Sequence, residues 1–233
     1  MVLKANTDAF VSEPDVAVRA WSGPGFWIRW VGATTLGWAL TYAVVGVITG
    51  LTGQSDTPLT RGVGALLTLA TLALQWLVLR PWMERAWRWI PVSIAGEAIG
   101  LVLFFLSVLA LRAALGGETD TPEALVELFV TSLPPAIAQW LLLRTVAQNA
   151  WRWLVANLFW MALFIPVVLF FTLLNSGAEA EGLEPITGIG PAVSQAIFSA
   201  FIGAILGFLA SAITGAELAY LLRHPKQAAP AAA

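Results

Sequence analysis

The chain lacks cysteine and contains a single histidine, His224. Without cysteine there is no disulfide bond, no thiolate metal site and no cysteine nucleophile. One histidine is too few for a histidine metal cluster and argues against a Ser-His-Asp triad. The sequence also has no HExxH, GxSxG or Walker motif, which would indicate metalloprotease, hydrolase or nucleotide sites. These absences predict a protein that is not an enzyme.

Charge is equally scarce. Charged residues make up 11% of the 233 residues and hydrophobic residues 58%, whereas a soluble domain carries about 25% charged residues. The 12 Lys and Arg residues against 14 Asp and Glu give a net charge of −2, which excludes the basic surface that nucleic-acid binding needs. The high hydrophobicity excludes an intrinsically disordered chain. An integral membrane protein remains, with membrane lipids as its immediate partners.

Six stretches are apolar over the length of about 20 residues that a helix needs to cross the hydrocarbon core. They do not alternate in polarity as the strands of a membrane barrel do. The predicted spans are residues 31–51, 62–79, 91–111, 124–143, 154–174 and 191–222. We therefore expect an all-α transmembrane bundle at 26–223, between a cytoplasmic N-terminal tail at 1–25 and a disordered C-terminal tail at 224–233.

The basic residues predict the orientation of this bundle. Ten of the 12 Lys and Arg residues lie in the two tails and in the loops that follow the second and fourth spans. Because positive residues are retained on the cytoplasmic side, both termini are predicted to be cytoplasmic. Ten of the 12 tryptophans lie near the same side, where an indole prefers the headgroup level.

This aromatic and basic rim is interpreted as a set of interfacial anchors. Its predicted members are Trp76, Trp87, Arg88, Trp89, Trp140, Trp151, Arg152 and Trp153. We favour simple anchoring in the headgroup layer. The alternative is that a protein partner, a lipid or a pigment-like ligand is held at this rim.

A duplication links two parts of the chain. QWLVLRPWMERAWRWI at 75–90 and QWLLLRTVAQNAWRWL at 139–154 are identical at nine of sixteen positions, at an offset of 64 residues. Weaker copies are FWIRWV at 26–31 and YLLR at 220–223. They predict three hairpins of two spans each, related as parallel repeats by an axis along the membrane normal, unless the copies merely share an efficient interfacial turn. The hairpins cover approximately 27–80, 87–144 and 151–223.

The repeated QWLxLR and W-R-W motifs, with the opening FWIRWVGATTLGWAL and the closing AITGAELAYLLR, resemble a family of small polytopic bacterial membrane proteins of unassigned function. The resemblance covers most of residues 26–223 and departs at the acidic loop 175–190 and at the pair Pro134-Pro135. It implies the three-hairpin architecture in a bacterial inner or internal membrane. It carries over no catalytic or binding residue and leaves any cofactor unknown.

The predicted sixth span has a small residue at every fourth position, a spacing that lets two helix backbones approach closely. This helix-packing ridge consists of Ser199, Gly203, Gly207, Ser211 and Gly215. We favour packing within the bundle over a homo-oligomer or a docking face for a larger membrane complex. Prolines are expected to interrupt the fourth span at Pro134 and Pro135 and to bend the fifth at Pro166.

Two carboxylates and three amides lie at one depth of the predicted bundle, in its cytoplasmic half. A polar group inside a membrane is costly and therefore marks a candidate site. The predicted intramembrane polar cluster is Glu97, Glu217, Gln75, Gln139 and Asn157. A shared pocket open to the cytoplasm explains the coincidence, and the alternative is that each group snorkels or bonds to a neighbouring helix on its own.

These observations lead to two function hypotheses. The first is a non-catalytic structural or assembly subunit that binds protein partners, lipid or an apolar cofactor within the membrane. The second is a small secondary transporter coupled to protons through Glu97 and Glu217. No metal ligand set is present in the sequence.

Overall fold

The described part of the chain consists of helices joined by short turns. The computed structural model describes residues 24–54, 57–115, 120–180 and 187–225. The tails predicted at 1–25 and 224–233 lie outside the described residues except for two residues each. Across the described ranges there is no β-strand, and one isolated bridge joins Ala147 to Pro225. The predicted all-α class is confirmed.

Each of the six predicted apolar stretches lies within a long helix of its own. The helices are α2 (Pro24–Thr52), α3 (Pro58–Leu79), α4 (Trp89–Leu115), α5 (Asp120–Leu143), α6 (Trp151–Ala180) and α7 (Ile189–Arg223), with the 3-10 turn η1 (Ala86–Arg88) before α4. In the described residues, four segments are long and apolar enough to cross a membrane: Pro24–Thr52, Pro58–Leu79, Ala86–Ala114 and Ile189–Arg223. The apolar parts of α5 and α6 are shorter, at Phe129–Leu143 and Trp151–Val167.

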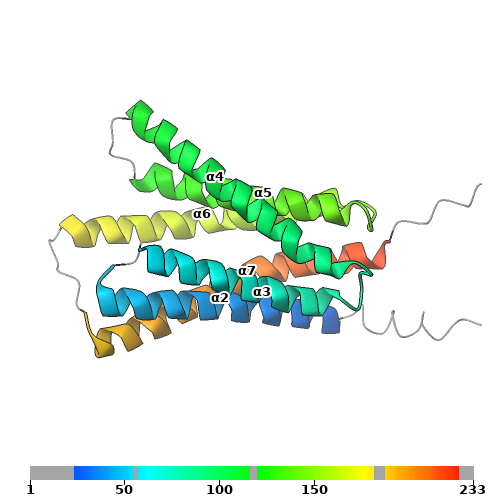
Figure 1. Ribbon diagram of the computed structural model, residues 1–233, viewed down its shortest axis with the longest axis horizontal. Coiled ribbons are helices and arrows are strands. Elements are labelled where there is room, and N and C mark those ends of the chain that lie inside the picture. Colours follow the sequence, from blue (N-terminus) through cyan, green and yellow to red (C-terminus); the bar gives the residue numbers. More distant parts are fainter. Residues whose placement is uncertain (1–23, 55–56, 116–119, 181–186, 226–233) are drawn as a thin grey trace, which may run out of the picture.

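The six long helices form a ring. Each helix contacts the next one along the chain, and α7 returns to contact α2, which gives the most extensive interface of the bundle. The turns at 80–88 and 144–150 lie at the same end of the bundle as Pro24 and Pro225 (Figure 1). The sequence segments with most of the basic residues therefore lie together at one end, which we call the basic end.

Close packing of α7 on α2 explains the ridge of small residues. Gly203 and Gly207 lie against Trp38, and Gly215 lies against Trp30. In return, Gly50 of α2 faces Ala192, where an added Cβ would stand 2.4 Å from the Ala192 Cα. The ridge is thus covered within the chain. The helix that carries the ridge, α7, is continuous over 35 residues and is about 52 Å long at the usual helical rise.

The prolines do not interrupt their helices, contrary to the prediction for Pro134 and Pro135. Both lie inside α5, and Pro166 lies inside α6. Proline removes an N–H and so leaves the carbonyl four residues earlier without its helical donor. The carbonyls of Val130 and Thr131 lie beside Gly100 of α4, whose added Cβ would stand 3.0 Å from each oxygen. A side chain at position 100 would therefore crowd the α5 backbone, and glycine allows α4 to approach it here.

Candidate functional site

Three tryptophans meet at the axis of the bundle near its basic end. Trp30, Trp89 and Trp153 are 1%, 0% and 2% exposed. Every pair packs edge to face, with ring centroids 5.7 to 6.4 Å apart and interplanar angles of 77° to 83°. Such edge-to-face geometry is the favoured arrangement of aromatic rings. We call these three residues the tryptophan layer.

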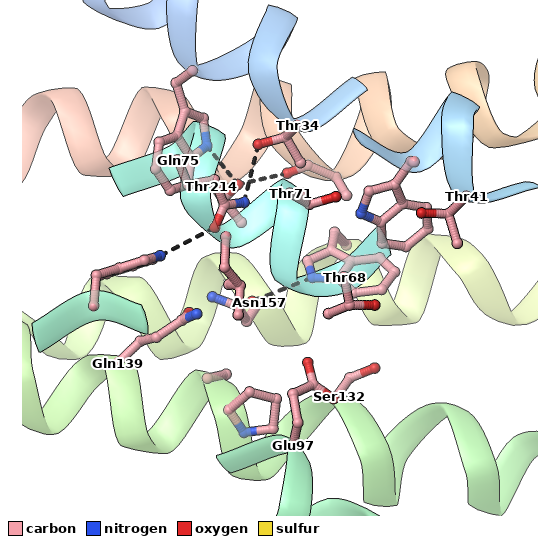
Figure 2. A pocket seen from close by; sticks show the side chains of 18 of the residues that line it. Thr34, Thr41, Thr68, Thr71, Gln75, Glu97, Ser132, Gln139, Asn157 and Thr214 are labelled. Carbon is pink, nitrogen blue, oxygen red and sulfur yellow. Dashed lines mark hydrogen bonds between the residues drawn. The ribbon is translucent and has the colours of Figure 1, made fainter. Parts of the chain in front are cut away.

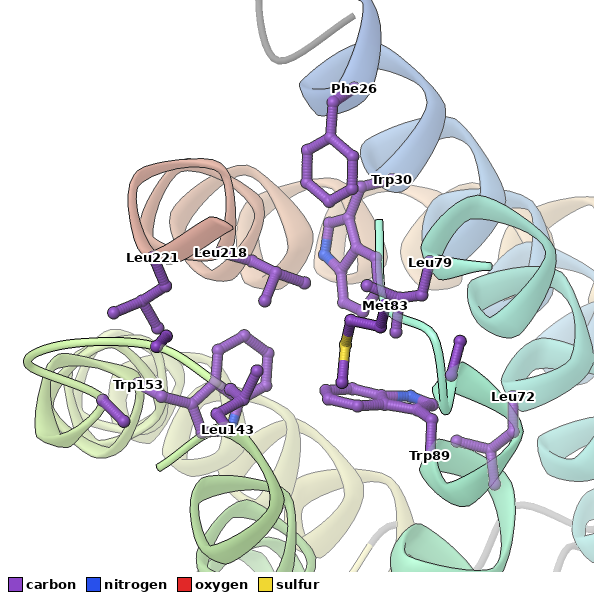
Figure 3. Packing of buried hydrophobic residues seen from close by; sticks show 13 residues of the cluster. Phe26, Trp30, Leu72, Leu79, Met83, Trp89, Leu143, Trp153, Leu218 and Leu221 are labelled. Atoms are coloured by element: carbon purple, nitrogen blue, oxygen red, sulfur yellow. The ribbon is translucent and has the colours of Figure 1, made fainter. Parts of the chain in front are cut away.

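Apolar side chains pack around this layer. Figure 3 shows Leu79, Leu143, Leu218 and Leu221 gathered around the indoles, with Met83 from the turn that follows α3. This cluster fills the interior between the tryptophan layer and the turns at the basic end. It closes the bundle there.

Two predicted anchors therefore prove to be interior residues. Trp89 and Trp153 were expected at the lipid interface, but they are buried, whereas Trp87 and Trp151 are 59% and 57% exposed. The reason is helical geometry, because two residues along an α-helix are about 200° apart around its axis. In each W-R-W motif the first indole therefore faces outward and the second inward. Trp76 and Trp140 are partly buried against the core cluster, and Arg88 is exposed.

A cavity of about 320 Å³ lies next to the tryptophan layer, and all six long helices contribute to its wall. Its polar lining residues are Thr34, Thr41, Thr68, Thr71, Gln75, Glu97, Ser132, Gln139, Asn157 and Thr214. Its volume falls in the usual range for small-molecule sites. On α2 the wall runs from Trp30 to Tyr42, away from the basic end. The tryptophan layer thus closes the cavity on the side where an opening was predicted.

Figure 2 shows how the polar groups are distributed. The threonines of α2 and α3 lie on one side of the cavity, and Glu97 and Ser132 of α4 and α5 lie on the other. The hydroxyls of Thr41, Thr68 and Thr71 each donate to the carbonyl four residues earlier, over 2.9 to 3.0 Å. Because the proton is used in this bond, the oxygen remains as an acceptor. The threonine wall is therefore rich in acceptors.

Two glutamines connect the cavity wall to neighbouring helices. Gln75 donates to the Thr34 hydroxyl over 3.1 Å and accepts from the Trp89 indole N–H over 3.1 Å. Gln139 donates to the Ser93 hydroxyl over 2.8 Å. These bonds fix both amides at the level of the tryptophan layer.

Helices α6 and α7 take part in a different set of polar contacts. Asn157 donates to the backbone carbonyl of Trp153 over 2.8 Å and accepts from the Trp160 indole over 3.3 Å. The Trp30 indole donates to the Thr214 hydroxyl over 3.4 Å. The Trp153 indole N–H is buried and finds no partner among the described residues. An unpaired buried donor is costly, so this N–H lowers the stability of the tryptophan layer.

Glu97 stands alone in the cavity wall. The sequence of α4 places it in the middle of an apolar span, and the side chain is exposed to the open cavity. Within the described ranges, no hydrogen-bond donor or cation contacts its carboxylate, and none of the residues that line the cavity is Lys, Arg or His. A carboxylate at this depth needs a proton or a countercharge.

Glu217 does not reach this cavity. Its carboxylate pairs with Arg152 through two hydrogen bonds of 2.8 and 2.9 Å, and the two side chains are 26% and 37% exposed. The Arg152 guanidinium also lies 4.2 Å from the centroid of the Tyr220 ring. Four members of the predicted polar cluster, Gln75, Glu97, Gln139 and Asn157, line one cavity, and the fifth forms a separate ion pair.

Sequence reasoning missed the aromatic and hydroxyl parts of the wall. Trp38 stacks with Tyr42 at 6.1 Å and meets Trp160 edge to face at 6.1 Å. Trp38 and Trp160 are the two tryptophans outside the basic rim, which was an available signal. The threonines gave a weaker signal, because a threonine in an apolar helix satisfies its own hydroxyl and is unremarkable in sequence.

The contacts between α2 and α3 recur at matching positions between α4 and α5. Thr34 and Ser93 each follow a tryptophan of the layer by four residues, and each accepts from a glutamine of the next helix, Gln75 or Gln139. Gly37 and Gly96 follow the same tryptophans by seven residues. Gly37 lies against Thr71, and Gly96 lies against Pro135, which is the residue 64 positions after Thr71.

Comparison of the chain with protein-family models, curated proteins and solved structures gives no match. The likeness to small polytopic bacterial membrane proteins therefore stays a resemblance carried by the motifs. No group of three or more His, Cys, Asp and Glu residues that could hold a metal ion occurs in the described part of the chain. The site is thus characterised by its own geometry alone.

Proposed function

We propose that the protein is a non-catalytic integral membrane protein of six spans that binds a small molecule in its central cavity. The observation that carries this proposal is the wall itself, to which all six long helices contribute polar or aromatic side chains. Polar residues inside a membrane bundle usually face a water-filled cavity or a substrate path. An apolar pigment or lipid tail fits this acceptor-rich wall less well than a ligand with a polar head.

The same proposal includes the three hairpins. The matching glutamine and glycine contacts of the first two hairpins support it, and so does the tryptophan layer, which takes one indole from the first helix of each hairpin. Parallel repeats around an axis along the membrane normal would bring such residues to the axis. With the basic end in the cytoplasm, the tryptophan layer would seal the cavity from that side.

A second candidate function is proton-coupled transport. The unpaired Glu97 carboxylate in the cavity favours it, because such a group can exchange a proton with a bound substrate. Glu217, paired with Arg152, adds no support for coupling. The ridge on α7 is covered by α2, so it lends no support to a homo-oligomer or to docking on a larger complex.

The lack of native cysteine makes single-cysteine labelling the direct test. Thr68→Cys places a thiol in the cavity wall, and Leu66→Cys places one on the outer face of the same helix, where Leu66 is 66% exposed. In membrane vesicles we expect a water-soluble maleimide to label the first thiol and not the second, which lipid would cover. Equal labelling of both, or labelling of Leu66→Cys alone, would contradict a hydrated cavity inside a membrane bundle.

A further inference from the structure

We propose that the cavity is a binding site for a small organic cation, an ammonium compound held between the Glu97 carboxylate and the indoles of Trp38 and Trp160. This inference deepens the proposed function and rests on it. It follows from three features of the wall, which are its charge, its aromatic rings and its acceptors.

The charge of the wall has one sign. Glu97 is the only titratable acid among the lining residues, and the lining contains no basic residue. An anionic or strongly acidic ligand would meet a carboxylate there without any cation to balance it. A cationic ligand would supply the countercharge that the carboxylate lacks among the described residues.

The aromatic rings supply the second feature. The lining includes the five tryptophans Trp30, Trp38, Trp89, Trp153 and Trp160, and one tyrosine, Tyr42. The three rings of Trp38, Tyr42 and Trp160 pack on one another and form a continuous wall beyond the tryptophan layer. The faces of such rings attract ammonium groups, and tryptophan does so most strongly.

The acceptors of the opposite wall are the third feature. The hydroxyls of Thr41, Thr68 and Thr71 donate hydrogen bonds to backbone carbonyls. Their oxygen lone pairs therefore remain available to a donor group of a ligand. A carboxylate, hydroxyl oxygens and indole faces together form a site for an ammonium group.

Charged thiol reagents test this inference in the full chain reconstituted in vesicles. We compare the labelling rate of Thr68→Cys with a trimethylammonium-ethyl and a sulfonatoethyl methanethiosulfonate, and divide their ratio by the ratio at Gln54→Cys, an exposed position just after the end of α2 that is remote from the basic end. We expect the cationic reagent to be favoured by about tenfold or more, as for a cleft of one charge sign. Glu97→Gln should abolish the preference, whereas Glu217→Gln, outside the cavity, should leave it unchanged.

Competition then separates the ligand class from the cavity itself. Choline should slow the labelling of Thr68→Cys more than its neutral isostere 3,3-dimethylbutan-1-ol, and Trp38→Leu or Trp160→Leu should weaken that protection. Equal protection by both compounds, or a charge preference that survives Glu97→Gln, would overturn the cation site while leaving a hydrated cavity in place. If Thr68→Cys resists every reagent, the proposed function fails as well.

Discussion

The two ends of the central space contain the same kinds of residues but use them differently. At the basic end, three indoles pack on one another and two of them donate to a side chain of a neighbouring helix. In the cavity, Trp38 and Trp160 also pack together, yet they border open volume beside an unpaired carboxylate. Tryptophan can therefore close a membrane bundle or line a site in it, depending on whether neighbouring side chains fill the space beside it.

The largest loss of unfolding free energy is expected from a substitution within the tryptophan layer. Trp30→Ala removes the indole that touches both other members of the tryptophan layer, and we expect a loss of about 3 to 5 kcal/mol in unfolding free energy, as for a large buried aromatic. Trp160→Ala at the cavity should cost clearly less, because its ring already borders open space. Thermal unfolding in one detergent measures both, with the exposed Trp87→Ala as the control. Similar costs for the two variants would remove the distinction between a packed layer and an open cavity.

Close glycine contacts between neighbouring helices should give the next largest effect on stability. An added Cβ at Gly96 would stand 2.4 Å from the Cα of Pro135, so Gly96→Ala forces α4 and α5 apart beside Glu97. We expect a loss of about 1 to 3 kcal/mol from overpacking, measured by unfolding in detergent. Gly32→Ala is the matched control, since nothing lies within 4 Å of its added Cβ and alanine favours a helix. A neutral Gly96→Ala would contradict the close approach of α4 to α5.

The tryptophan layer also contains a smaller, internally matched comparison. Trp89→Phe and Trp153→Phe remove the same atoms from buried positions, but only the Trp89 N–H has a partner, Gln75. We expect Trp89→Phe to cost about 1 kcal/mol more, because it leaves an amide oxygen without its donor. Calorimetric unfolding of the two variants measures the difference. Equal costs would mean that the Trp153 N–H is bonded in the membrane, to water or to a ligand.

The sequence predicted the helices well and the side-chain partners poorly. Apolar runs of helical length fix the secondary structure, because every backbone group must be satisfied within the helix. The depth of Gln75, Gln139 and Asn157 followed from counting residues to the nearest arginine, and that of Glu97 from counting residues after Pro91. The direction in which each side chain faces around its helix axis could not be counted in this way. For this reason Trp89 and Trp153, which are buried, were assigned to the lipid interface.

Long-range pairing was equally inaccessible from the sequence. The depth of Glu217 resembles that of Glu97, yet its pairing with Arg152 depends on how α6 meets α7. The predicted break at Pro134 and Pro135 failed for a related reason. The sequence reveals the missing N–H groups but not that Gly100 of α4 would approach the carbonyls of Val130 and Thr131.

The smallest effect on stability is expected at the ion pair of Arg152 and Glu217, which is partly exposed and lies outside the packed interior of the bundle. Arg152 and Glu217 are both partly exposed, so solvent screens them, and a double-mutant cycle of Arg152→Met and Glu217→Gln should give only a small coupling free energy. High salt should reduce this coupling. Arg88→Met is the natural control, because Arg88 occupies the same place in the W-R-W motif at 87–89 and stands over Trp87, without a carboxylate partner among the described residues. A large coupling that salt does not change would mean that Glu217 is held in a desolvated site, and would restore it as a candidate for proton coupling beside Glu97.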